Sequence, residues 1–562
     1  MQAREAFYDE IIGLLMQEEL TKDALHQKKL SLAKEHALKR IPSDIDILLN
    51  ATLQEREQIN LLMKPIRTQA GVSPVAIMSA PFACPHGKCT FCPDHLKEGI
   101  PMSYTGKEPA SMRGKRWDWD AYLQTYNRLE QYVLMGHSPQ KCEVIVMGGT
   151  MPSYPVQYQR SFMKDCFKAL NDFGERFYPE GELDLEAFKE FFELPGNKED
   201  AQRVARVEKK LREQKKLGQE RTLQEEQTRN ERAYIRCVGL TFETRPDCAL
   251  EPHSNLMLEL GVTRVELGVQ TVYDESLHIT HRAHDSAMNK RSVQILRDLG
   301  FKLNFHLMPG LPGADKKRIS YEKDLAGMKE IFVDEGYRPD MIKLYPCMVM
   351  PNTPLAEDYQ AGIFEPMQTQ EAIKLLRELM PHVPEYCRIM RVQRDIPTYR
   401  TEAGVDKTNL RQMVHEQPVK CRDIRAREVK DEKILAQDVE ILIKEYPASG
   451  GVEYFISAED TKQDLLVGFL RMRYPKESLR EEITSETAII RELHVYGHAT
   501  PLSKDGTTQH RGWGTKLLQE AERIATQAGK KKMVVISGVG VRAYYIDKHG
   551  YHHDGPYVSK EL

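Results

Sequence analysis

The stretch Cys84-Pro85-His86-Gly87-Lys88-Cys89-Thr90-Phe91-Cys92-Pro93 decides how this chain is interpreted, because it holds three thiols at C-x4-C-x2-C spacing. It follows the apolar run Pro74–Met78, which predicts a buried strand leading into a loop. Thiolates are soft ligands, typical of iron–sulfur clusters and of zinc. Three are too few for a closed zinc site, but they suit a four-iron cluster with one iron open to a substrate. A zinc loop, with His86 or a remote residue as fourth ligand, is the alternative.

Length and composition indicate the class of protein. A chain of 562 residues exceeds what one core supports, so we expect two or three domains. With 80 Lys and Arg against 83 Asp and Glu, any anionic partner must meet a local basic patch. Ten cysteines without a signal sequence indicate a reducing compartment. No apolar stretch approaches the roughly 18 residues of a membrane span, so we expect a cytoplasmic protein with no membrane partner.

Six short apolar strands, each followed by a loop and helical sequence, are predicted in the first two thirds of the chain. They are Val75–Ser79, Glu143–Met147, Val238–Phe242, Arg264–Val269, Leu303–Leu307 and Met341–Leu344. Alternation of strand and helix predicts a parallel sheet with right-handed crossovers. The expected fold class is therefore α/β, beginning with an incomplete (βα)6 barrel whose site lies at the C-terminal ends of the strands.

Polar residues and glycines stand at the ends of these predicted strands. They are Gly148, Gly149 and Thr150 after the second, Glu243 and Arg245 after the third, Glu266, Gly268 and Gln270 in the fourth, and Asn304 and His306 in the fifth. Side chains alternate along a strand, so the residues within the fourth strand share a face, as do those within the fifth. A closed barrel fills its interior with apolar residues. Polar inward residues therefore predict an open interior that holds a ligand.

The chain divides into four segments. Residues 1–72 are predicted to be amphipathic packing helices, and residues 73–380 hold the barrel, with a charged helical insert at 173–232 that we interpret as a solvated surface. Residues 381–434 are a basic linker, with ten Lys and Arg against five acids between Arg388 and Arg427. Residues 435–562 form a second domain. In the first segment, the basic residues that could touch a polyanion are Lys39, Arg40, Lys64 and Arg67.

Three further cysteines, Cys347, Cys387 and Cys421, lie around the basic linker. They could share a structural zinc, with His415 or His382 as a fourth ligand. Unrelated buried thiols are an equally good interpretation of the same residues.

A glycine-rich turn marks the second domain. Predicted strands at Val452–Ser457, Leu465–Arg471 and Ala488–Tyr496 are followed by Gln509-His510-Arg511-Gly512-Trp513-Gly514-Thr515, and then by an amphipathic helix and the strand Lys532–Ser537. A glycine-rich turn at a helix N-terminus offers free backbone N–H groups to a pyrophosphate.

These residues resemble known families. The barrel resembles radical S-adenosylmethionine (radical SAM) enzymes, and Gln509-x-x-Gly512-x-Gly514 resembles the acetyl-CoA loop of GNAT-type acetyltransferases. Together with Glu492–Gly497, Arg391–Pro397 and Cys421–Glu428, they make the chain similar to the family of Elongator catalytic subunits, including its stand-alone archaeal and bacterial forms. The likeness runs from about residue 72 to the C-terminus and extends to the N-terminal helices.

The resemblance implies the cofactors and the residues that bind them. Cys84, Cys89 and Cys92 would hold a [4Fe-4S] cluster whose open iron binds S-adenosylmethionine, with the polar strand-end residues named above around it. The C-x4-C-x2-C spacing departs from the usual C-x3-C-x2-C, and Thr150 stands where the wider family often has glutamate. Residues carried over for acetyl-CoA are Glu492, Leu493, His494, Val495, Arg511, Gly512, Trp513, Gly514, Thr515, Tyr544 and Tyr545, with Lys141 as a further catalytic residue.

The reaction implied by the resemblance is radical modification of tRNA. A 5′-deoxyadenosyl radical takes hydrogen from the methyl of acetyl-CoA, and the product is 5-carboxymethyluridine at the wobble position of an anticodon. The partners are then the anticodon stem-loop of tRNA, acetyl-CoA and an electron donor. The sequence leaves undecided whether the protein forms a homodimer. Expected RNA contacts are Arg391, Arg394, Arg400, Arg422 and Arg425. The main rival is a protein lysine acetyltransferase whose cluster is only structural.

Overall fold

The structure is a computed structural model of the chain. It describes residues 2–18, 20–38, 41–59, 71–196, 200–394, 396, 398–407, 409–430, 432, 434–496 and 512–562. Lys39, Arg40, Lys64, Arg67 and Arg511 lie outside these described residues. Among the described helices, none has the length and apolar character needed to cross a membrane.

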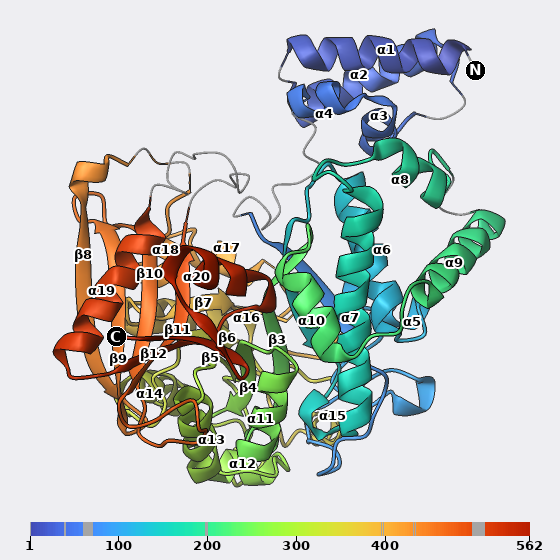
Figure 1. Cartoon of the computed structure of the whole chain (residues 1–562). Helices are drawn as coiled ribbons and strands as arrows, with labels where there is room; N and C mark the ends of the chain where they lie inside the picture. Colours follow the sequence, from blue (N-terminus) through green and yellow to red (C-terminus); the bar gives the residue numbers. More distant parts are fainter. Residues whose placement is uncertain are drawn as a thin grey trace.

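The centre of the molecule is a half-barrel of seven parallel strands in sequential order (Figure 1). The strands are β1 (Ser73–Met78), β2 (Lys141–Met147), β3 (Arg236–Thr244), β4 (Arg264–Gln270), β5 (Lys302–Leu307), β6 (Met341–Leu344) and β7 (Arg388–Arg391). The six predicted strands are confirmed. The seventh, β7, corrects the prediction of six strands, because it lies within the segment that was assigned to the basic linker. It was missed because it has four residues with arginine at both ends, so it forms no apolar run.

Alternation along β2 explains how the half-barrel has two different faces. Cys142, Val144 and Val146 are fully buried against the surrounding helices. The residues between them, beginning with Glu143, face the hollow of the half-barrel and line its cavity. The interior is therefore open and partly polar, as the sequence predicts.

Helices pack around the half-barrel, most of them on its outer side, whereas the two that hold Arg113 and Arg425 line its cavity (Figure 1). The helices are α5 (Pro109–Arg116), α6 (Ala121–Leu134), α7 (Val156–Phe177), α11 (Glu251–Glu259), α12 (Asp274–Ile279), α13 (Ser286–Asp298), α14 (Tyr321–Val333), α15 (Pro354–Gln360), α16 (Thr369–Leu379), α17 (Leu410–Val414) and α18 (Ile424–Arg427). Helix α6 begins where the Asp120 carboxylate accepts from Leu123 N at 3.0 Å, which caps its free N–H groups.

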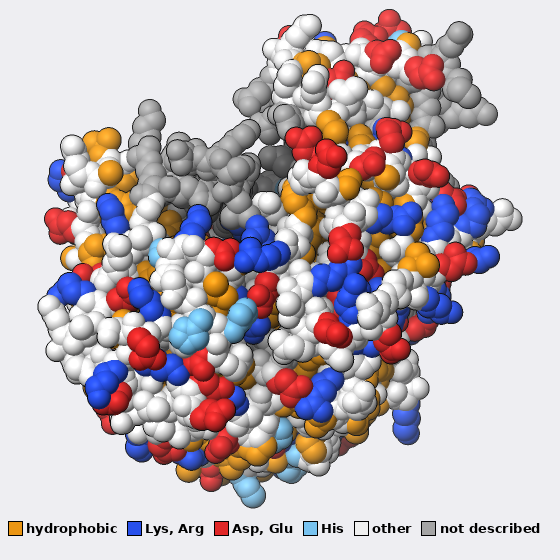
Figure 2. Space-filling model, viewed as in Figure 1, with side chains coloured by type: hydrophobic (Ala, Val, Ile, Leu, Met, Phe, Trp, Pro, Cys, Tyr) orange, Lys and Arg blue, Asp and Glu red, His pale blue; other side chains and the backbone are white. Residues whose placement is uncertain are grey.

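The insert at 173–232 is helical but only partly solvated. It holds α8 (Leu185–Phe192), α9 (Ala201–Lys216) and α10 (Leu223–Glu231). Helix α9 carries the charges, and Figure 2 shows Lys and Arg side chains gathered over it. Phe173, Phe188 and Phe192, however, are fully buried in an aromatic cluster that reaches Tyr126 of α6. The prediction of a solvated surface is therefore wrong for this aromatic part, because the local excess of charge hid its phenylalanines.

The N-terminal helices form a small bundle above the half-barrel (Figure 1). They are α1 (Gln2–Gln17), α2 (Lys22–Glu35), α3 (Asp44–Asn50) and α4 (Leu53–Gln58). Phe7, Ile11 and Ile47 are fully buried in a core separate from that of the barrel. The bundle therefore consists of packing helices, as the amphipathic pattern predicts.

The C-terminal domain is a second sheet of seven strands in the order β13-β14-β12-β11-β10-β9-β8. Its strands are β8 (Val439–Ala448), β9 (Gly451–Asp460), β10 (Leu465–Tyr474), β11 (Thr487–Val495), β12 (Lys532–Val535), β13 (His552–Asp554) and β14 (Tyr557–Glu561). Helices α19 (Trp513–Gln527) and α20 (Arg542–His549) follow the expected strand–loop–helix–strand order. The sheet is mixed, because only β11 and β12 run parallel.

A buried network of charged residues joins the two sheets. Arg473 of β10 binds Asp298 at the end of α13 at 2.6 Å, and Arg491 of β11 binds Asp340, next to β6, at 2.6 Å. Arg491 also binds Glu453 of β9 at 2.8 Å. All five side chains are fully buried. The contact between half-barrel and second domain therefore resembles an interior more than a surface, which fixes the relative position of the two sheets.

Candidate active site: one cavity from the thiols to the second domain

One cavity of about 990 Å³ passes through the half-barrel. At the C-terminal ends of the strands its wall includes Cys84, Cys89 and Cys92. At the opposite end it is lined by residues that begin strands, such as Pro74 and Lys302, and is closed by the second domain. The closing residues are Phe469, Arg471, Glu492, His494 and Tyr496. Thiols and second domain, far apart in the sequence, therefore face the same cavity.

The three thiols line the cavity with polar groups around them, but among the described residues they form no group of three ligand atoms within 4.8 Å of one another. His86 Nε2 lies 3.1 Å from Cys89 Sγ, and Arg282 donates to the same sulfur at 3.5 Å. Cys92 Sγ lies 3.1 Å from Ser103 Oγ. Burial raises the pKa of Cys84, and it raises the pKa of Cys92 to about 11. Buried thiols of this kind become thiolates when cations bind them, so the donor set fits an iron–sulfur cluster.

The glycine turn after β2 brings Thr150 to the thiols. Gly148 and Gly149 have φ angles of 114° and 78°, a region that favours glycine. A Cβ on Gly148 would stand 2.4 Å from Ser79 Oγ, whose hydroxyl donates to the Gly148 carbonyl. The turn places Thr150 Oγ1 3.8 Å from Cys84 Sγ.

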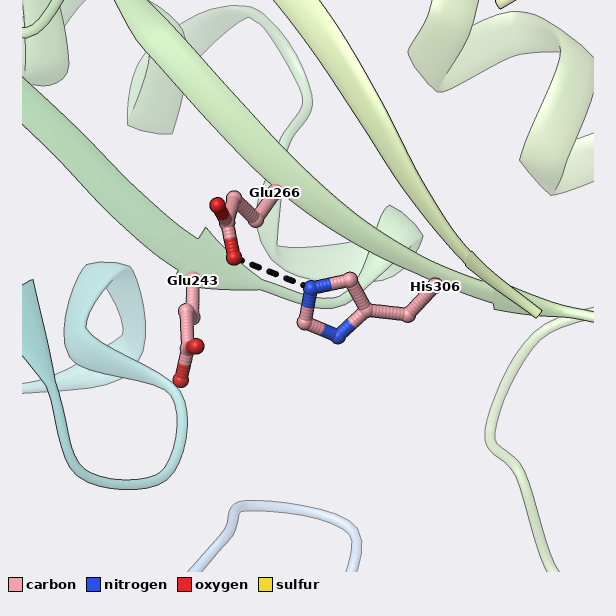
Figure 3. Close-up of side chains that lie close together, drawn as sticks. All are labelled: Glu243, Glu266 and His306. Carbon is pink, nitrogen blue, oxygen red and sulfur yellow. Dashed lines mark hydrogen bonds and ion pairs between the residues drawn. The ribbon is translucent and has the colours of Figure 1, made fainter. Parts of the chain in front are cut away.

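The predicted polar strand-end residues meet in the middle of the cavity (Figure 3). The carboxylate of Glu266 lies 3.0 Å from His306 Nε2, and Asn304 donates to it at 3.2 Å. Glu243 lies opposite and accepts from Tyr104 Oη at 2.8 Å. Period-two alternation thus placed these side chains correctly.

Lys343 of β6 forms an ion pair with Glu266. Burial alone would raise the pKa of Glu266, but Lys343 and His306 lower it well below its ordinary value. Burial alone would lower the pKa of Lys343, but Glu266 raises it. Ligand atoms of Glu243, Glu266 and His306 also lie within 4.8 Å of one another. Because Lys343 already neutralises Glu266, we assign no metal ion there.

Several buried polar atoms on the cavity wall have no partner among the described residues. Arg245 binds Asp247 through one edge of its guanidinium, which leaves Nη1 without a partner. Gln270, at φ 66°, presents an unpartnered Oε1. Buried polar atoms are normally paired, so these groups fit a polar ligand in the cavity. Arg245 and Gln270 were both predicted from the sequence.

The predicted RNA-contacting arginines separate into two groups. Arg391, Arg394 and Arg425 line the cavity, and Arg394 donates to the Ser103 carbonyl at 2.8 Å. Arg400 is exposed and lies outside this cavity. Arg422 pairs with Asp464 of the second domain at 2.9 Å. The cation group at the cavity is therefore smaller than the basic linker suggested.

Strand β11 lies between the cavity and Gly514, which belongs to the described part of the predicted acetyl-CoA loop. Glu492 and His494 line the cavity. The alternate residues Leu493 and Val495 pack in the core instead, and Val495 Cγ2 would lie 3.9 Å from a Cβ on Gly514. Strand β12 pairs with β11 only from Thr487 to Ile490, so the end of β11 extends beyond it. One strand thus carries both sets of residues on its two faces.

The start of α19 gathers most of the remaining predicted residues. Gly512 is the N-cap of α19, with φ 78°, and a Cβ on Gly514 would stand 3.1 Å from Tyr544 Oη. Burial raises the pKa of Tyr544, and a hydrogen bond with Thr515 partly lowers it. Trp513 and Tyr545 are buried and belong to the packing. Tyr544 is therefore the tyrosine that lies beside the glycine turn.

Lys141 begins β2 on the same face as Glu143, but it does not line the cavity. Burial lowers its pKa, and the neighbouring Arg236 lowers it further. Its assignment as a catalytic residue is not supported by this position.

Cys347, Cys387 and Cys421 are not brought together as a metal site. Among the described residues, they belong to no group of three metal-ligating side chains within 4.8 Å. Cys347 packs with Cys89 and Leu355, whereas Cys421 Sγ lies 3.2 Å from Asp423. We therefore make no zinc assignment.

Sequence reasoning missed several residues of the cavity. Lys343 could have been found, because it interrupts the apolar strand Met341–Leu344 on the inward face. Arg471 likewise interrupts β10 and binds Glu492 at 2.9 Å. Arg282 and Ser103 lie in loops, where no periodic pattern in the sequence indicates which side chains face the cavity.

Comparison with known proteins identifies the family. Residues 4–69 match the ELP3 N-terminal domain, residues 78–321 the radical SAM superfamily and residues 339–418 the radical SAM C-terminal domain. The chain is 41% identical to the tRNA uridine(34) acetyltransferase of Methanocaldococcus jannaschii over 540 residues, which cover 93% of this chain and 90% of that protein. It is 38% identical to Elongator complex protein 3 of Schizosaccharomyces pombe, covering 96% of this chain and 94% of that one.

A solved structure agrees with these relatives. An archaeal Elp3 of Methanocaldococcus infernus, truncated at its N-terminus, superposes with a TM-score of 0.70 at 36% identity. The match covers 88% of this chain and all of that one. With the radical SAM half-barrel, the second mixed sheet and relatives at this identity over nearly the full length, the chain belongs to the Elp3 family, that of Elongator complex protein 3.

Proposed function

We propose that this protein uses acetyl-CoA and S-adenosylmethionine to form 5-carboxymethyluridine at the wobble uridine of tRNA. Relatives at 41% and 40% identity are named tRNA uridine(34) acetyltransferase. The observation that carries the proposal is the cavity, because the thiols and the acetyl-CoA-motif strand β11 both face it.

Cys84, Cys89 and Cys92 would hold a [4Fe-4S] cluster at one end of this cavity. When bound, the cluster and S-adenosylmethionine supply a carbon radical able to take hydrogen from an unactivated methyl group. The protein supplies position, fixed charges and exclusion of water. Glu266 and Lys343 provide charges, and His306 a polar group, that are already oriented inside the half-barrel, so no reorganisation is needed when a ligand binds.

Acetyl-CoA would bind at the second domain. The Gly512–Thr515 turn at the start of α19 offers backbone N–H groups to the pyrophosphate. Tyr544 Oη lies beside this turn. From there the acetyl group would pass along β11 to the cavity face that carries Glu492 and His494.

The uridine would enter past the arginines of the basic segment. Arg391, Arg394 and Arg425 line the cavity, and guanidinium groups suit phosphate binding. An anticodon loop is single-stranded, so extruding one base costs little. The arginine-lined part of the cavity therefore fits an RNA substrate better than a lysine side chain of a folded protein.

The experiment is an anaerobic reaction with tRNA, acetyl-CoA, S-adenosylmethionine and dithionite, followed by nucleoside mass spectrometry. We expect 5-carboxymethyluridine from the wild-type protein and none from C89A or C92A. If the wild-type protein leaves uridine unchanged while C89A acetylates a protein lysine at the full wild-type rate, the protein is an ordinary lysine acetyltransferase and the proposal fails.

A further inference from the structure

A second cavity of about 610 Å³ lies next to the cysteine loop. Four cations line it: Lys107 precedes α5, Lys115 and Arg116 end α5, and Arg400 closes the short 3-10 turn Thr398–Arg400. All four side chains are exposed. Cations at the rim of an exposed hollow attract an anionic partner from solution.

These four cations have no carboxylate partner among the described residues. The acid that also lines the second cavity, Glu98, is engaged by His95 at 3.2 Å. Met112, also on the wall, is 50% exposed. Unpaired cations around an exposed apolar side chain are typical of a transient protein interface that is steered by charge.

A single layer of chain separates the two cavities. Cys92, Ser103 and Tyr104 line the main cavity, whereas Pro93, directly after Cys92, and Thr105, directly after Tyr104, line the second. The layer is closed by hydrogen bonds: Ser103 N donates to the Pro93 carbonyl at 3.3 Å, and Ser103 Oγ lies 3.1 Å from Cys92 Sγ. A partner seated in the second cavity would therefore lie one residue from a cluster ligand.

The proposed reaction needs such a second entrance. S-adenosylmethionine, the acetyl group and the uridine would fill the main cavity, so a reductant cannot reach the cluster through it. We propose that the surface formed by Lys107, Lys115, Arg116 and Arg400 docks an acidic one-electron carrier protein of the iron–sulfur class. The carrier is oxidised by one electron, the cluster is reduced by one electron, and no proton or bond is exchanged. This inference rests on the cluster of the proposed function.

The test uses an acidic [2Fe-2S] ferredoxin as the probe. The variant K107E/K115E/R116E reverses three charges of the surface, and K209E/K216E/K548E reverses three exposed lysines elsewhere. At low ionic strength we expect the first variant to bind ferredoxin at least about tenfold more weakly than wild type, and the second to bind as wild type does. The neutral variant K107Q/K115Q/R116Q should give an intermediate affinity.

Two further readouts separate the alternatives. Reduction of the reconstituted cluster by ferredoxin should slow in K107E/K115E/R116E, while reduction by dithionite keeps its wild-type rate and tRNA affinity stays unchanged. Wild-type ferredoxin affinity in that variant overturns the inference, and so does an equal loss of tRNA affinity, which would make the surface an RNA site. Intact ferredoxin binding and cluster reduction without any uridine product would overturn the proposed function alone.

Discussion

Asp324 shows how one buried carboxyl makes stability depend on pH. It is 2% exposed, in the first turn of α14, and accepts from the Gly310 N–H at 2.7 Å. Burial raises its pKa to about 7. The folded protein therefore binds this proton more tightly than the unfolded chain does. The stability it contributes is complete below pH about 4 and is lost as the pH rises through about 7.

We expect D324N to remove this dependence. Amide for carboxyl keeps an acceptor for Gly310 and needs no proton. Between pH 5 and pH 8, the free energy of unfolding of D324N relative to wild type should increase by about 2–3 kcal/mol. Denaturant titrations at several pH values measure it.

Asp334, at the end of the same helix, provides the control. Burial alone would raise its pKa, but Lys290 and the Gly336 N–H lower it. The stability that the Asp334 carboxylate contributes is therefore present above pH about 4. D334N should accordingly destabilise the protein at neutral pH. A flat difference between D324N and wild type from pH 5 to pH 8 would contradict the account of Asp324.

The start of α19 is the element on which acetyl-CoA binding depends. Gly512 and Gly529 flank this helix with φ angles of 78° and 75°, and no atom of the described residues lies within 4 Å of a Cβ added to either. Gly514 differs, because an added Cβ would stand 3.1 Å from Tyr544 Oη. A methyl group there must displace the tyrosine or tilt the turn.

We therefore expect G514A to weaken acetyl-CoA binding about tenfold, a loss on the order of 1.4 kcal/mol. Iron content should stay at the wild-type value, since the thiols lie in the other domain. Isothermal titration of acetyl-CoA and iron analysis measure the two quantities. The matched variant G529A places a Cβ at positive φ, so it should lower stability by about 1–2 kcal/mol without changing acetyl-CoA affinity. Equal effects of the two variants on that affinity would argue against a site at this turn.

Elements with a clear period could be predicted from the sequence. The strands from β1 to β6 have apolar residues on one face, and the polar residues of β4 and β5 lie on the inward face, so Glu266 and His306 were found. Strand β7 was not found, because Arg388 and Arg391 flank only two apolar residues. Lys141 was expected at the active site, but it lies outside the cavity. The strand pattern gives the face on which a residue lies and does not give the extent of the cavity along the strand.

At the scale of the whole molecule, the buried ion pairs between the two domains hold the thiols of the half-barrel and strand β11 of the second domain at a fixed separation. Removing one member of a buried ion pair leaves its partner desolvated and unpaired, which costs about 3–5 kcal/mol. Pairs of this kind could not be predicted from the sequence, because they join residues such as Asp298 and Arg473 that belong to different domains. In the sequence, nothing distinguishes the arginines of these pairs from other polar residues in strands.

We expect R491M to remove the ion pairs of Arg491 with Asp340 and Glu453. Asp340 then keeps Arg471 at 3.5 Å, and Glu453 keeps Arg473 at 3.1 Å, so each buried carboxylate loses part of its compensation. The thermal midpoint should fall by several degrees, in line with a loss of about 3–5 kcal/mol, and proteolysis between the two sheets should accelerate. The control R422M breaks an exposed pair with Asp464 and should change stability by less than about 1 kcal/mol. If R491M melts as R422M does, the network does not hold the domains together.

The central claim is that one cavity lets chemistry at the thiols reach an acetyl group bound at the second domain. The direct test supplies acetyl-CoA with a fully deuterated methyl group, together with tRNA, S-adenosylmethionine and dithionite, and weighs the 5′-deoxyadenosine that forms. The account predicts one deuterium in 5′-deoxyadenosine, lost in C89A and reduced in G514A. Formation of 5′-deoxyadenosine without deuterium by wild-type protein, while the acetyl methyl keeps its full label, would contradict it.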